Sequence, residues 1–70
     1  MKMDSALKEM LESKMDQIFC VFFTLEALRN EAPEIKGKIT EIFGESGFIV
    51  VDKVYRVNMD FIMCFWFESP

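Results

Sequence analysis

Two segments in the C-terminal half of this 70-residue chain consist mostly of residues that favour β-strands. Phe48 to Val57 and Asp60 to Glu68 are dense in Val, Ile, Phe, Tyr and Trp, the β-branched and aromatic types that pack well on a pleated surface. Asn58 lies between them at a point where the chain can turn. The pattern predicts two antiparallel strands joined by a tight turn, with Val57 facing Asp60.

A third strand is expected just before them. The segment from Lys38 to Phe43 is followed by a loop of hairpin length that begins and ends with glycine, at Gly44 and Gly47. The resulting meander covers about residues 37–68, with Phe43 facing Phe48. The alternative is a second helix over residues 33–43, because several apolar residues there also have helical spacing; Gly37 inside the segment favours the strand.

The N-terminal part has the apolar period of an α-helix. Asp4 or Ser5 can cap its first turn, and Pro33 ends it because the residue before proline avoids the helical region. We therefore expect a long helix over about residues 5–30. Its predicted apolar stripe is formed by Leu7, Leu11, Met15, Ile18, Phe22 and Leu25.

The run from Ile18 to Phe23 is apolar on every side and rich in strand formers. This leaves a strand over residues 18–25 as an alternative to the continuous helix. With either choice, residues 1–70 form a single α+β domain. The favoured architecture is a long N-terminal helix packed on a three-stranded antiparallel β-meander.

Both faces of the predicted meander are mostly apolar, whereas a sheet with one wet face alternates apolar and polar residues. The helix is expected to cover the Phe-rich face, which includes Phe43, Phe48 and Val50. The opposite face then needs another cover, and a second copy of the chain requires only one self-complementary patch. We therefore predict a homodimer, with a free edge of the strand Asp60 to Glu68 as a further pairing site. The partner or dimer interface is predicted to comprise Ile49, Val51, Tyr55, Ile62 and Trp66.

The composition excludes most catalytic chemistry. The chain has no His and two Cys, so it lacks an imidazole base, a Cys–His pair and a four-ligand zinc site. We expect no catalytic residues, no metal site and no cofactor, and a protein that is not an enzyme. Cys20 and Cys64 have no framework spacing, no signal peptide is recognised, and the longest apolar run is too short to span a bilayer. These features predict a cytoplasmic protein with reduced thiols.

The net charge of −4 argues against direct nucleic-acid binding, which depends on clustered Lys and Arg, and against anionic membrane surfaces. The expected function is a small acidic protein-binding module, an inhibitor or adaptor that occupies a partner protein's surface. The specific hypothesis is that acidic residues mimic phosphates in the basic groove of a nucleic-acid-handling protein. The candidate acidic contacts are Glu26, Glu31, Glu34, Glu41 and Glu45.

The alternative function is a carrier of a small hydrophobic ligand. An apolar space between the helix and the sheet could hold such a ligand. Its predicted lining consists of Phe22, Phe43, Phe65 and Phe67. Electrostatic mimicry and apolar binding respond differently to salt, which distinguishes the two hypotheses.

Overall fold

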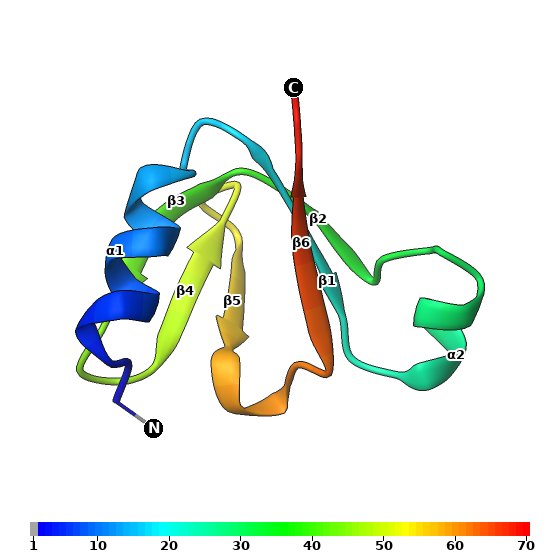
Figure 1. Ribbon diagram of the computed structural model, residues 1–70, viewed down its shortest axis with the longest axis horizontal. Helices are drawn as coiled ribbons and strands as arrows, with labels where there is room; N and C mark the ends of the chain where they lie inside the picture. Colours follow the sequence, from blue (N-terminus) through cyan, green and yellow to red (C-terminus); the bar gives the residue numbers. More distant parts are fainter. Residues whose placement is uncertain (1) are drawn as a thin grey trace.

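The computed structural model describes residues 2–70, which form two three-stranded antiparallel sheets and two short α-helices (Figure 1). Sheet A has the strand order β2-β1-β6 and sheet B has the order β3-β4-β5. The elements are α1 (Ser5–Ser13), β1 (Ile18–Phe22), α2 (Leu25–Arg29), β2 (Ile35–Gly37), β3 (Ile39–Phe43), β4 (Phe48–Val51), β5 (Tyr55–Asn58), the 3-10 helix η1 (Met59–Phe61) and β6 (Cys64–Glu68).

The hydrophobic core draws side chains from both sheets and from α1. Figure 1 shows α1 beside β3 and β4, and α2 at the opposite end of the molecule, beyond β1 and β2. The buried core cluster comprises Met3, Leu11, Phe19, Val21, Ile39, Ile49, Val51, Val57 and Met59. Because two sheets share this core, each sheet covers one face of the other. No helix within residues 2–70 is long and apolar enough to cross a membrane.

The expected long N-terminal helix is wrong beyond its first third. α1 begins after Asp4, whose carboxylate accepts the Leu7 N–H at 2.7 Å, and it ends at Ser13. The next apolar run forms β1, the central strand of sheet A, and four of its five side chains are buried. A central strand covered on both faces needs a continuous apolar sequence, which explains why this segment lacks the alternation of a half-exposed strand. The alternative of a strand near residues 18–25 is therefore confirmed over Ile18–Phe22.

The helix alternative for residues 33–43 is wrong, because this segment forms β2 and β3. Only Lys38 separates the two strands, so the chain bends there and passes from sheet A to sheet B. The predicted pairing of Phe43 with Phe48 is confirmed. A three-stranded meander exists, but it spans β3 to β5, residues 39–58, rather than 37–68.

The two C-terminal strands differ from the prediction because the chain turns earlier. Asp52 and Lys53 have φ values of 54° and 63°, and they divide the expected strand Phe48 to Val57 into β4 and β5. Asp60 lies in η1, so it does not face Val57. β6 then crosses to the other sheet and pairs with β1, with Trp66 opposite Cys20.

The bend between the sheets is held by Asp52. Its carboxylate Oδ1 accepts the Lys38 N–H at 2.9 Å, and its own N–H donates to the Lys38 carbonyl at 2.8 Å. The carboxylate lies so close to Gly37 that a Cβ at that position would be 2.2 Å from Oδ2. Glycine at position 37 therefore makes room for the hydrogen bonds that join the bend to the β4–β5 turn.

Candidate interaction surface

Sheet B turns one face to the core and the other to solvent. Ile49 and Val51 of β4 are fully buried, so Phe48 and Val50, which alternate with them along the strand, point outward. We call the outward side of sheet B the aromatic face. It comprises Glu41, Phe43, Phe48, Val50, Arg56 and Asn58.

The centre of the aromatic face is a stack of two rings and a guanidinium. The ring centroids of Phe43 and Phe48 are 4.8 Å apart, with the planes inclined by 32°. The Arg56 guanidinium carbon lies 4.4 Å from the Phe48 centroid, within the range of a cation–π contact. Phe43 remains 40% exposed. The sheet thus presents aromatic surface to water together with a positive charge ordered against it.

Strand register arranges the aromatic face in two rows. The first row runs across the sheet from Glu41 through Val50 to Arg56, and the second runs from Phe43 through Phe48 to Asn58. Glu41 and Arg56 are both exposed and lie at opposite ends of their row, on the two outer strands. The face therefore carries one negative and one positive charge on either side of an apolar centre.

The outer face of sheet A is closed by its own side chains. Cys20 and Phe22 are fully buried there, and the Trp66 ring lies 4.5 Å from the Phe22 ring. The Trp66 indole N–H donates to Glu68 Oε2 at 3.3 Å, and Glu68 Oε1 pairs with Lys36 Nζ at 3.2 Å. These contacts connect all three strands of the sheet and hold Trp66 over the apolar residues beneath it.

The titratable groups of this cluster have shifted pKa values with structural causes. The hydrogen bond from Lys36, followed by the one from Trp66, lowers the pKa of the Glu68 carboxyl. Burial, followed by the nearby charge of Glu68, raises the pKa of the Cys20 thiol. Cys20 is therefore a protonated thiol at neutral pH, and thiols of this kind are poor nucleophiles.

The two thiols lie on the same face of neighbouring strands but not opposite each other. Cys20 faces Trp66, and Cys64 faces Phe22, so the two cysteines are diagonal neighbours. Diagonal pairs in an antiparallel ladder have Cα atoms roughly 7–8 Å apart, beyond the usual span of a disulfide. Both cysteines are free in the structure.

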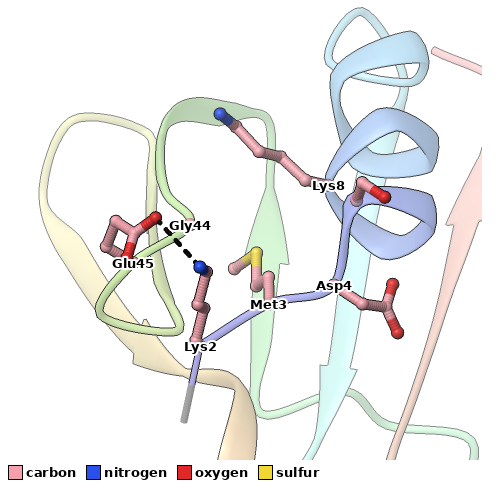
Figure 2. A pocket seen from close by; sticks show the side chains of 7 residues that line it. Lys2, Met3, Asp4, Lys8, Gly44 and Glu45 are labelled. Atoms are coloured by element: carbon pink, nitrogen blue, oxygen red, sulfur yellow. Dashed lines mark ion pairs between the residues drawn. The ribbon is translucent and has the colours of Figure 1, made fainter.

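A shallow hollow of about 510 Å³ lies where the chain enters α1 (Figure 2). The Met3 N–H donates to the Gly44 carbonyl at 2.8 Å, which fastens this segment to the β3–β4 turn. Lys2 pairs with Glu45 at 3.5 Å, and both side chains are mostly exposed. Charges of both signs around an open hollow suit a solvated surface better than a ligand site.

The predicted dimer face is largely the interior of the protein. Ile49 and Val51 are fully buried, so their assignment to an interface is wrong. Ile62 and Trp66 are half-buried, whereas Tyr55 is 52% exposed at the edge of sheet B. The prediction placed the Phe-rich side of the sheet inside the protein, under a helix, whereas the structure exposes that side on sheet B. The charged side chains on that face, Glu41 and Arg56, are the sequence signal for its exposure.

The five candidate acidic residues do not form one surface. Glu26 and Glu31 belong to α2 and its C-terminal end, while Glu45 lies in the β3–β4 turn at the far end of the molecule (Figure 1). Glu34 accepts hydrogen bonds from the Phe23 and Thr24 N–H groups at the start of α2. Only Glu41 lies on the aromatic face.

The four phenylalanines assigned to a ligand space do not share one either. Phe22 is buried on the outer side of sheet A, and Phe43 is on the outer side of sheet B. Phe65 and Phe67 pack on the Phe19 ring at 5.3 and 5.2 Å. The four rings therefore lie in three separate places and do not line a common cavity.

Among residues 2–70, no group of three or more Cys, Asp or Glu side chains is arranged to hold a metal ion. Comparison with known proteins finds no family model, no curated protein and no solved structure that matches the chain.

Proposed function

We propose that this chain is a non-enzymatic protein-binding module whose recognition surface is the aromatic face. The observation that supports this proposal is the stack of Arg56 on Phe48 beside the exposed ring of Phe43. Aromatic residues and arginine are enriched at protein interfaces and at their energetic hot spots. The stack also orders these side chains before binding, which reduces the entropy lost on association.

The same face is less suited to nucleic acid. A base-stacking platform works together with cations that follow the phosphate backbone. The only cation on the aromatic face is Arg56, and Glu41 lies in the same row. Combined with the net charge of −4, this arrangement favours a protein as the bound partner.

A module that binds a partner protein's surface without catalysing a reaction acts as an inhibitor or an adaptor. Acidic mimicry of nucleic acid receives less support than apolar recognition, because the five glutamates are dispersed and the Glu34 carboxylate already accepts the Phe23 and Thr24 N–H groups just before α2. A carrier function is also less favoured, because its four phenylalanines do not enclose a common space. The aromatic face instead brings together one exposed apolar side chain, Phe43, and two half-buried ones, Phe48 and Val50.

Affinity capture from the native host tests this proposal with wild-type protein and two variants as bait. Phe43→Ser removes one ring of the aromatic face, and Leu25→Ser removes a similarly exposed apolar side chain from α2. We expect a partner that Leu25→Ser retains and Phe43→Ser loses by at least about tenfold, as for a hot-spot truncation. Capture of the same proteins by all three baits, or of none, contradicts the proposal.

Salt separates the two modes of recognition in the same experiment. A partner held by the aromatic face should stay bound when salt is raised from about 50 to 200 mM, because apolar contacts are not screened. A partner held through the dispersed carboxylates should elute. The second result would replace the aromatic face with electrostatic mimicry as the binding mode.

A further inference from the structure

The aromatic face is complementary to itself, and we propose that a second copy of this chain binds there. The inference rests on the proposed function, because it uses the same surface, and it adds a second copy of the chain to the proteins bound there. It arises from the first row of the face, in which Glu41 on β3 and Arg56 on β5 lie on either side of Val50 on β4. Opposite charges at equal distance from a central strand are what a two-fold symmetric contact requires.

The register of β3, β4 and β5 defines the two-fold rotation that relates the two copies. A half-turn about an axis parallel to β4, lying just above that strand, lays a second sheet B face to face on the first. The β3 strand of one copy then lies opposite the β5 strand of the other, while β4 lies opposite β4. Glu41 of each copy therefore meets Arg56 of the other, and the ion pair forms twice.

The apolar residues are matched by the same rotation. Val50 meets Val50 at the centre, and Phe48 meets Phe48 in the second row. Phe43 lies opposite Asn58, so its exposed ring covers a half-buried side chain. Facing sheets pack about 10 Å apart, a distance filled by side chains of this size. The contact thus covers the exposed aromatic surface without placing like charges together.

The size of the face sets the strength of the dimer. Standard stable interfaces use about 20–30 residues on each side, several times the number on this face. The dimer is therefore weak and reversible, with a dissociation constant on the order of micromolar or above. Sedimentation over a range of roughly 5 to 500 µM should accordingly show a shift from monomer to dimer.

Charge reversal with rescue tests the assigned partner. Glu41→Arg and Arg56→Glu each place like charges in both ion-pair positions, and each should weaken dimerisation by at least about tenfold. The double variant restores opposite charges and should recover dimerisation. Glu26→Arg, which changes an exposed charge on α2, should leave it unchanged. Circular dichroism and urea unfolding check that each variant keeps its fold.

A cross-linking measurement locates the contact independently. Val50→Cys in a Cys64→Ser background should form a covalent dimer with a bismaleimide reagent that spans about 10 Å, because residue 50 faces its own copy. Glu26→Cys in the same background should not. A wild-type protein that remains monomeric throughout, or a dimer that both single charge reversals leave unchanged, overturns the proposal. Neither result affects capture of a different partner, so failure here is distinguishable from failure of the proposed function.

Discussion

At the scale of single residues, the path of the chain depends on Gly37. This residue ends β2, directly before the bend that carries the chain from sheet A to sheet B. Its missing side chain leaves room for the Asp52 carboxylate, which bonds to the next backbone amide. Apart from the glycine itself, nothing in the sequence predicts that the Asp52 carboxylate contacts the backbone at this position.

Gly37→Ala should lower the free energy of unfolding by about 1–2 kcal/mol. The new methyl group displaces the Asp52 carboxylate and removes its hydrogen bond to Lys38. Urea denaturation measures the change. Gly44→Ala is the matched control, because a Cβ there meets only the flexible Lys8 side chain at 3.1 Å, and its effect should be within about 0.5 kcal/mol. Equal effects at both glycines would contradict the role assigned to Asp52.

At the scale of secondary structure, the β4–β5 hairpin shows how a short turn redirects an apolar segment. The Val54 N–H donates to the Val51 carbonyl at 3.1 Å, and both intervening residues have positive φ. This is the conformation of a type I′ turn, whose twist matches that of the strands it joins. The Lys53 N–H also donates to Thr40 Oγ1 at 3.0 Å, which ties the turn to β3.

The φ value of 63° at Lys53 makes this hairpin sensitive to backbone substitution. Lys53→Gly should raise the free energy of unfolding by about 0.5 kcal/mol, since glycine adopts this conformation without steric cost. Lys53→Val should lower it by about 1 kcal/mol, because a β-branched residue is disfavoured there. Both variants remove the same charge, so their difference in urea denaturation isolates the backbone effect. The opposite order of stability would exclude a strained turn.

At the scale of the whole molecule, burial of Cys20 couples its reactivity to unfolding. Cys20 is fully buried beneath the outer face of sheet A, and its pKa is raised by that burial. Cys64, on the adjacent strand, is only half-buried. Cys20 can therefore react only when β1 and its neighbours open.

Alkylation kinetics of two single-cysteine variants test this coupling. Under native conditions at neutral pH, Cys20 in Cys64→Ser should react at least about a hundredfold more slowly than Cys64 in Cys20→Ser. Urea should accelerate the reaction of Cys20 in parallel with global unfolding. Similar rates for both thiols without denaturant would show that sheet A opens locally.

Several features of this protein follow from local sequence alone. The capped start of α1 near Asp4, the strand character of residues 39–43 and the pairing of Phe43 with Phe48 across a four-residue loop were all predictable. Each depends on groups that are close together in the chain: an N-cap oxygen and its amide, or a hairpin with glycine at both ends. The absence of histidine likewise removes imidazole chemistry whatever the fold.

The assignment of inside and outside was decided only by tertiary structure. Ile18–Phe22 has an apolar sequence that suits a buried helix as well as a central strand, and its partners β2 and β6 lie far along the chain. Once β1 recruits β6 into a second sheet, Ile49 and Val51 face the core, while Phe43 and Arg56 face solvent. Period-two alternation determines which side chains share a face, but the cover of each face is a long-range property. Alternation grouped Phe43, Phe48 and Val50 on one side of the sheet, but only the tertiary structure turned that side to solvent. The β-bulge between Ile39 and Glu41, which alternation does not reveal, turns Ile39 into the core.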